Sequence, residues 1–449
     1  HRDLHSFPTR RSSDLAIIFT SLFFLLICCS DNPSEPGDGG PYKQNSVIYD
    51  VEYYENTIIY SGSKKEALLN VDSTGVFFTF DAQKLGEPPH IGAVIIIDGL
   101  YLRKVKQVQT SGSNYIIETE DAAITDAIKN GKISWDFTPE LNNVQIVYVN
   151  DKKLKSDKPL KDEFEYEFEL GNWKYTIWMK AAGTSQNGLT QIQVNFITEN
   201  TEGAGGKVTS TLGAKGLTRI PRQQATIEIK DGKMTTFDNQ NRGLRSELTL
   251  EYVAQFSAGG GQAIVEFPQL TMKIPITAFT SLPIPIPIYI NVGISFNTIV
   301  NVPSVTASAM AKVKLILDSN TGFKFEGPSV SMNADVNGKD LGELWWDIGD
   351  MSFSPAPVEI RYDLSCPRIG VEIVGSEVAW AAATFSSRAK FIVPSLCKAA
   401  LAQIRLEGGY KFDILGYTLA ESSKVFYDIN REIKTSNCEI GRASCRERV

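Results

Sequence analysis

The octapeptide EFEYEFEL, residues Glu163–Leu170, alternates glutamates with aromatic or aliphatic residues. Successive side chains of a β-strand point to opposite faces, so this alternation predicts a strand with one buried and one solvated face. The same period recurs in ELTLEYVAQF (Glu247–Phe256) and VEIRYDL (Val358–Leu364). A single wet face is typical of antiparallel sheets. We therefore expect residues 140–438 to form a large antiparallel β-domain, either a sandwich or an elongated twisted sheet. The exposed glutamate row requires cationic partners on the neighbouring strand.

A long uncharged stretch lies between Lys273 and Lys312. Within it, Pro283, Pro285 and Pro287 cannot donate to a β-ladder, so Leu282–Pro287 is predicted as an extended lead-in at a sheet edge. The apolar residues that follow predict a strand over Ile288–Val302, which would be about 50 Å long. With the next apolar strand it gives an uncharged amphipathic hairpin, residues 288–311. Such a hairpin fits the core of an elongated sandwich, a lipid-contacting surface or a membrane-inserting hairpin.

Two further segments carry residues typical of turns. Asn320-Thr321-Gly322 and Asn337-Gly338 are both predicted to reverse the chain, because asparagine and glycine adopt the backbone conformations that tight turns need. The second segment lies in DVNGKD, Asp335–Asp340, which lacks the full ligand spacing of a calcium loop. The sequence predicts no metal site and no cofactor.

A smaller β-rich domain is predicted over residues 46–139, as a small barrel or roll with one helix. The helix is expected at Glu120–Lys129, because Thr119 can cap it and Asn130-Gly131 can end it. Short apolar segments separated by turn residues predict the strands of this domain. They are VFFTF (Val76–Phe80), AVIII (Ala93–Ile97), LRKVKQV (Leu102–Val108) and YIIETE (Tyr115–Glu120).

Sequence motifs for catalysis are scarce. His90 is the single histidine away from the N-terminal end, and no serine lies in a G-x-S-x-G elbow. We therefore predict no catalytic residues and no enzyme activity, with carboxylate chemistry of the glycosidase kind left open. The candidate ligand surface is Trp345, Trp346 and Asp347, where aromatic rings adjoin a carboxylate. Because neighbouring residues of a strand face opposite ways, one tryptophan is expected in the core.

The two ends of the chain resemble translated sequencing adapters, at residues 1–15 and 439–449. Between them, the apolar run Ala16–Ile27 is too short to span a bilayer and has the length of a signal-peptide core. The cysteine pair and Ser-Asp that follow resemble the lipobox of Bacteroidota-type surface lipoproteins. This resemblance implies a signal peptide over 16–28, lipidation of Cys29 and a flexible tether over 29–45.

Charge and cysteine content limit the partners further. The net charge is -7, without a basic stripe, so nucleic acid is not expected as a partner. Cys366, Cys397 and Cys438 are candidates for a disulfide outside the cytoplasm, with three possible pairings, and free buried thiols are the alternative.

Taken with the lipobox, these features predict an outer-membrane lipoprotein, surface-exposed or periplasmic, that is held to the membrane by its N-terminal lipid. Its main expected role is a non-catalytic binding, adhesion or structural module with a glycan, lipid or protein ligand. The alternatives are a lipid- or membrane-interacting protein that uses the hairpin, and a carbohydrate-binding or carbohydrate-active protein.

Overall fold

The computed structural model describes most of the chain as β-strand. The described residues belong to one compact unit, Asn45–Val449. Among them, no helix is long and apolar enough to cross a membrane. The described ranges are 45–140, 143–149, 152–153, 163–170, 173–184, 190–200, 208–256, 261–266, 269–302, 307–327, 329–348, 358–392, 397–416 and 422–434. The expected mostly-β class is confirmed.

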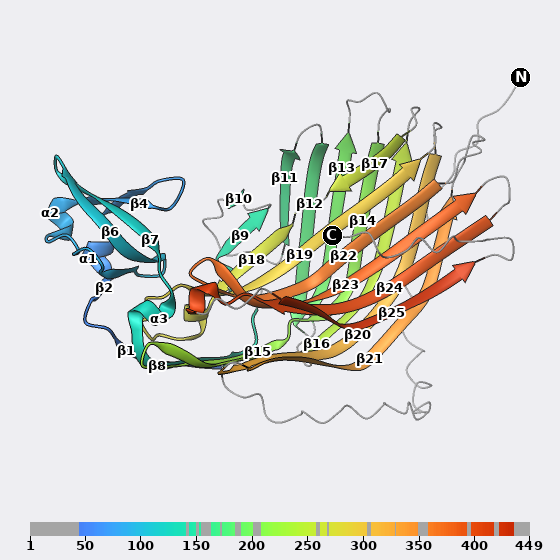
Figure 1. Ribbon diagram of the computed structural model, residues 1–449. Helices are drawn as coiled ribbons and strands as arrows, with labels where there is room; N and C mark the ends of the chain where they lie inside the picture. Colours follow the sequence, from blue (N-terminus) through green and yellow to red (C-terminus); the bar gives the residue numbers. More distant parts are fainter. Residues whose placement is uncertain are drawn as a thin grey trace, which may run out of the picture. The chain divides into compact units, whose positions relative to one another are not determined.

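A ten-stranded antiparallel sheet, called the first sheet here, is organised around one very long strand (Figure 1). That strand, β16 (Lys233–Phe256), has 24 residues. The order of the sheet is β1-β8-β15-β16-β14-β13-β12-β11, with β20 on the other side of β16 and β21 beyond β20. The other bounds are β1 (Ser46–Tyr53), β8 (Ile128–Phe137), β11 (Glu163–Leu170), β12 (Trp173–Thr184), β13 (Thr190–Asn200), β14 (Val208–Arg219), β15 (Arg222–Lys230), β20 (Ala307–Glu326) and β21 (Ser329–Ile348).

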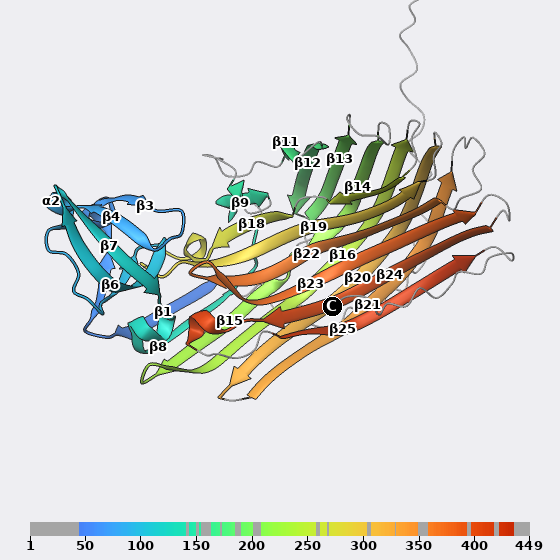
Figure 2. The same cartoon turned by 45° about the horizontal axis from the view of Figure 1, so that its top comes forward.

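A nine-stranded sheet, the second sheet, packs against the first. Its order is β10-β9-β18-β19-β22-β23-β24-β25, with β17 on the far end of β19. Figure 2 shows β18 to β25 of this order side by side. The bounds are β9 (Ile146–Val149), β10 (Lys152–Lys153), β17 (Gly261–Glu266), β18 (Leu270–Pro275), β19 (Ile288–Val302), β22 (Val358–Ile373), β23 (Ser376–Ile392), β24 (Cys397–Tyr410) and β25 (Ser422–Lys434).

A small six-stranded sheet of order β2-β5-β6-β7-β4-β3 precedes the large sheets in sequence. Its strand Val94–Ile97 is buried on both faces, which explains its unbroken apolar run. The predicted boundary at residue 139 placed β1 and β8 in the small domain, whereas both pair within the first sheet. Remaining bounds are β2 (Thr57–Tyr60), β3 (Leu68–Val71), β4 (Phe77–Asp81), β5 (Val94–Ile97), β6 (Tyr101–Ser111), β7 (Asn114–Asp121), α1 (Gly62–Lys65), α2 (Ala82–Leu85), α3 (Ile124–Ala127), η2 (Ile276–Phe279) and η3 (Asp413–Leu415).

The predicted helix at Glu120–Lys129 is wrong except for one turn. β7 extends through Asp121, α3 contains only Ile124–Ala127, and β8 starts at the next residue. Ile124, Ala127 and Ile128 of this segment are buried in the main core. Strand pairing on either side satisfies more backbone groups than four helical residues could, so tertiary context overrides the local helix signals.

The predicted hairpin 288–311 is not a hairpin. The strand Ile288–Val302 has the predicted bounds, but it pairs with β17, β18 and β22 in the second sheet. The next strand, β20, pairs with β16 and β21 in the first sheet. The chain thus crosses from one sheet to the other between them, which is how the two layers of a sandwich are joined.

Two predicted turns lie inside long strands instead, one opposite a bulge of β16 and the other at a bulge of β21. Thr321, in the middle of β20, pairs with Asn241 of β16. On β21, Gly338 pairs with Asp318 and Val336 pairs with Ser319, so Asn337 is an extra, unpaired residue between them. Residues that favour turns also favour the local twist of a β-bulge, so the local signal was right about backbone irregularity and wrong about chain reversal.

These irregularities form a line across the first sheet, which we call the bulge line. Pro221 separates β14 from β15, which pair with successive parts of β16. Gly243 of β16 has a φ of +74°, and its amide N–H donates to Asn320 Oδ1 at 2.7 Å. The β20–β21 ladder has its own bulge beside that of β16. The hydrogen-bond ladders on both sides of β16, and that between β20 and β21, are therefore interrupted at the same level of the sheet. Such a line bends and twists a sheet, because each extra residue breaks the ladder locally.

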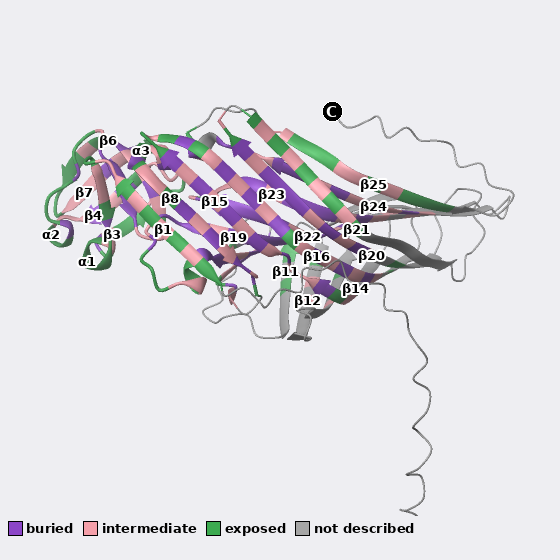
Figure 3. Ribbon diagram, turned by 90° about the horizontal axis from the view of Figure 1, so that it is seen from below, coloured by how far each residue is buried: buried purple, intermediate pink, exposed green. Residues whose placement is uncertain are grey.

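The main core lies between the two large sheets. Buried and partly buried residues alternate along β15, as Figure 3 shows. Aromatic rings fill the space beside the bulge line, with Phe412 contacting both Phe237 and Phe325 edge-to-face. Outside, the predicted cationic partner of the glutamate row is present, since Lys174 lies 3.1 Å from Glu167.

Candidate functional site

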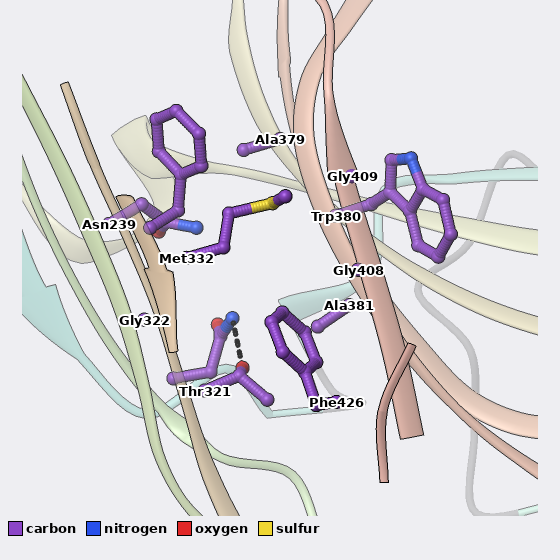
Figure 4. Close-up of a pocket in the computed structure, with 12 residues that line it drawn as sticks. Asn239, Thr321, Gly322, Met332, Ala379, Trp380, Ala381, Gly408, Gly409 and Phe426 are labelled. Carbon is purple, nitrogen blue, oxygen red and sulfur yellow. Dashed lines mark hydrogen bonds between the residues drawn. The ribbon is translucent and has the colours of Figure 1, made fainter. Parts of the chain in front are cut away.

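A cleft lies between the two sheets, beside the bulge line (Figure 4). The first sheet supplies amide and hydroxyl side chains, while the second sheet supplies mainly glycine and alanine. β21 and β25, the last strands of the two sheets, each contribute one larger residue. The lining residues are Asn239, Asn241, Thr321, Gly322, Phe323, Met332, Ala379, Trp380, Ala381, Gly408, Gly409 and Phe426.

The polar floor of the cleft follows from strand register. Asn239 and Asn241 are two residues apart on β16 and therefore share a face, and Thr321 pairs with Asn241 across to β20. The amide Nδ2 of Asn241 donates to Thr321 Oγ1 at 3.1 Å. All three residues are buried. The floor is thus a short polar ladder set into an otherwise apolar inner face.

Several polar atoms here lack a hydrogen-bond partner in the protein. They include the Oδ1 atoms of Asn239 and Asn241, and close to them in register Gln223 Nε2 and Ser319 Oγ. Each such buried atom costs about 1–3 kcal/mol of stability unless a ligand or water satisfies it. The free volume in the cleft is about 10 Å³, which is room for roughly one water or one hydroxyl.

The small residues of the second sheet keep this space open. A Cβ on Gly408 would lie 2.8 Å from Phe426 Cε2 and 2.9 Å from the Trp380 carbonyl oxygen. The side chain of Trp380 itself points away from the cleft (Figure 4). A residue larger than glycine at position 408 would therefore push the Phe426 ring or the neighbouring strand.

A second polar cluster lies on the outer face of the second sheet, and we call it the outer-face charged row. Lys273 Nζ contacts Glu372 at 2.6 Å, and Asn291 Nδ2 donates to the same carboxylate at 2.9 Å. Arg368 pairs with Glu377. Its members are Lys273, Asn291, Arg368, Glu372, Glu377 and Trp380, on strands β18, β19, β22 and β23.

The charges of the row are paired with one another, although the buried Asn291 Oδ1 has no hydrogen-bond partner. The guanidinium of Arg368 covers the Trp380 ring at 4.1 Å, and Lys273 lies 4.7 Å from the centre of the Tyr148 ring. Burial raises the pKa of Glu377, the nearby Glu372 raises it further, and Arg368 opposes both effects. Because its charges are paired and its aromatic faces are covered, this row stabilises the sheet. The cleft differs in having two unpartnered amide oxygens beside free volume.

The candidate surface Trp345, Trp346 and Asp347 lies on β21, where these residues pair with Lys312, Ala311 and Met310. Met332, at the cleft, is thirteen residues away on the same strand. At about 3.3 Å per residue this separation is roughly 43 Å, so the structure does not bring the tryptophan pair to the cleft.

The candidate disulfide residues are also separated. Cys366 is a buried free thiol, whose pKa burial raises to about 12. It lies next to Ser365, which pairs with Thr384, which in turn pairs with Arg405 of β24. Cys397 is eight residues further along β24, about 26 Å away, whereas bridged cysteines have Cα atoms within about 7 Å. A Cys366–Cys397 disulfide is therefore not compatible with this register. Cys29 and Cys438 lie outside the described residues.

The sequence-based reasoning missed the cleft. The sequence feature that could have revealed it is a break in the apolar face of β16. On the inner side of this strand, Asn239 and Asn241 stand between the apolar residues Phe237 and Leu244. Among the described residues there is no cluster of three or more His, Cys, Asp or Glu that could hold a metal ion.

No protein-family model, no curated protein and no solved structure matches this chain. The fold and the chemistry of the cleft therefore carry the functional argument.

Proposed function

We propose that this chain is a lipid-anchored, non-catalytic binding protein of the bacterial cell envelope, and that the cleft is its ligand site. The anchor is supported by the apolar run Ala16–Ile27 and the lipobox-like cysteine at Cys29. These features favour an outer-membrane lipoprotein that meets its ligand outside the cytoplasm.

The observation that carries the binding role is the pair of buried, unpartnered amide oxygens on Asn239 and Asn241. A ligand that donates hydrogen bonds to them recovers about 1–3 kcal/mol for each oxygen. Both residues lie within a long strand that is paired on both sides, so their positions are set before a ligand arrives.

The composition of the cleft favours binding over catalysis. None of its lining residues is a carboxylate, histidine, lysine or cysteine. General acid–base and nucleophilic catalysis need such groups within reach of the substrate, and Thr321 has no base beside it in the lining. The carboxylates of the outer-face charged row are held by cations.

The lipid- or membrane-interacting alternative depended on an amphipathic hairpin at residues 288–311. Since its two strands lie in different sheets, that segment offers no hairpin to insert. The small free volume of the cleft also gives no room for an acyl chain. A ligand with polar donors is the better match.

The anchor is tested by labelling cells with an alkyne analogue of palmitate. The wild type should incorporate the label and partition with membranes, whereas Cys29→Ser should do neither and Cys28→Ser should behave as the wild type. Labelled Cys29→Ser protein would contradict the anchor.

The orientation of the cleft is tested on intact cells with a membrane-impermeant maleimide. Met332→Cys places a thiol at the cleft opening, and it should react more than the wild type, whose buried Cys366 supplies a matched unreactive thiol. Equal reaction of both proteins would contradict presentation of the cleft to the medium. Asn430→Cys, an exposed site on β25, reports whether the protein reaches the surface at all.

A further inference from the structure

We propose that the cleft binds the end of a neutral glycan, with one ring hydroxyl in the polar floor and the ring against Phe426 and Met332. This inference rests on the proposed binding function and names its ligand class. It follows from three properties of the cleft, which are its volume, its charge and its opening.

The volume selects the group that enters. The free space of about 10 Å³ admits a group of roughly the size of water. A hydroxyl has this size, and it can donate to Asn239 Oδ1 or Asn241 Oδ1 while its own oxygen accepts a hydrogen bond. A carboxylate, a phosphate or an acetamido group is larger than the floor.

The absence of charge in the lining selects against ions. An ammonium group would also donate to the two amide oxygens, but it would lose its hydration against a lining that has no carboxylate. Burial of an unpaired charge costs far more than burial of a hydroxyl that is hydrogen-bonded. A methyl group would fit the space but would leave both oxygens unpaired, which is unfavourable.

The opening suits the face of a sugar ring. β21 and β25 are the last strands of their sheets, and residues of the two strands contact each other. Met332 and Phe426, from these strands, are partly buried and line the cleft. A pyranose ring presents C–H groups on its faces, which pack on aromatic and thioether side chains while its hydroxyls point outward. Figure 4 shows Phe426 beside Thr321, with Met332 above them.

The second sheet fixes how close the ring can approach. Gly408 leaves the wall without a side chain, and Ala379 and Ala381 each add only a methyl group. A Cβ at Gly408 would lie within 3 Å of Phe426 Cε2 and of the Trp380 carbonyl oxygen, so the wall cannot gain a side chain there without moving that ring or strand. A Cβ at Gly409 would instead meet the Trp380 ring, which points away from the cleft.

The experiment uses the detergent-solubilised full chain with ¹³C-labelled methionine methyl groups. Its six methionines give few signals, and that of Met332 is assigned with Met332→Leu. Neutral oligosaccharides derived from mannan, glucan and galactan are titrated separately, with an oligogalacturonate and a lysophospholipid as charged and lipidic probes. We expect one neutral glycan to shift the Met332 signal saturably, while buried Met272 stays unchanged.

Variants then test the contacts. Asn241→Leu and Asn239→Leu should each weaken binding about tenfold, the equivalent of one hydrogen bond of about 1.4 kcal/mol. Both remove an unpaired buried oxygen, and Asn241→Leu also removes the donor to Thr321 Oγ1; far-UV circular dichroism checks that both variants fold. Asn430→Leu, exposed on β25, is the matched control and should bind as the wild type.

The inference is overturned if no neutral glycan shifts the Met332 signal, or if the shift keeps its affinity in both cleft variants. If instead the oligogalacturonate or the lysophospholipid shifts Met332 in a way that depends on Asn241, the glycan inference fails and the binding function stands. If no probe shifts Met332 and Met332→Cys is also unreactive on cells, both fail.

Discussion

Lys273→Met should destabilise the protein far more than loss of an exposed ion pair. The Lys273 side chain is 17% exposed and that of its partner Glu372 is 8% exposed, with 2.6 Å between Nζ and Oε1. Removal of one partner from a buried pair costs about 3–5 kcal/mol, because the other charge stays buried without compensation. Glu372 keeps its hydrogen bond from Asn291. We therefore expect a cost near the lower end, about 3 kcal/mol.

The chain offers a matched control in Lys132 and Glu228. This pair also joins neighbouring strands, at 3.2 Å, but its side chains are 48% and 44% exposed. Lys132→Met should cost about 0.2–1 kcal/mol, because water already screens the pair. The double variant Lys273→Met/Glu372→Gln removes the uncompensated charge and should recover most of the loss.

Urea unfolding followed by far-UV circular dichroism measures the four free energies. The expected order of stability is wild type, Lys132→Met, the double variant and, clearly lowest, Lys273→Met. The reasoning is refuted if Lys273→Met costs less than about 1 kcal/mol, or if the double variant is as unstable as Lys273→Met.

Three further predictions concern single side chains. Trp135→Phe should lower the free energy of unfolding by about 1–3 kcal/mol in urea titrations, because the indole Nε1 donates at 3.0 Å to buried Gln223 Oε1, which would lose its partner; a neutral variant would contradict this. Asp72 accepts hydrogen bonds from Thr74 and from two backbone amides, which lower its pKa from 3.8 to about 2. The ionised Asp72 carboxylate therefore stabilises the folded protein fully above pH 3.8, its pKa in the unfolded chain, and this stabilisation is lost as pH falls toward 2. The difference in urea midpoint between wild type and Asp72→Ala should be largest at pH 7 and should vanish near pH 2; a difference that does not change with pH would contradict this prediction. Finally, Cys366 should not react with Ellman's reagent at pH 8 in the native protein, since burial raises its pKa to about 12; wild type and Cys366→Ala should give equal thiol counts until denatured, and a difference of one before denaturation would refute this.

Regular alternation made the strands predictable from sequence. Glu163–Leu170 and Ile288–Val302 have the bounds that the period-two pattern predicts. Their polarity pattern depends only on which side of a sheet each residue faces, and that is a local property. The mostly-β class follows from the same signal.

Pairing partners were not predictable in this way. Whether Ile288–Val302 pairs with the next strand or with β22, 70 residues after β19 begins, depends on contacts between distant segments. The asparagine and glycine signals at Asn320 and Asn337 have the same limit, because a bulge and a turn use similar backbone conformations. The cleft could not be predicted either, since it forms only where β16, β20, β21, β23, β24 and β25 converge.

The length of β16 has a consequence for how the protein is made. Its N-terminal part pairs with β15 and its C-terminal part with β14. Its other side pairs along its length with β20, which is synthesised later and ends at Glu326. Until that part of the chain has emerged, one side of β16 presents unpaired backbone groups to any passing strand. Such distant pairing slows folding and favours aggregation of incomplete chains. Truncated products that end before Ala307 should therefore accumulate as insoluble protein, whereas the full chain stays soluble if β20 is synthesised and pairs with β16 before aggregation begins.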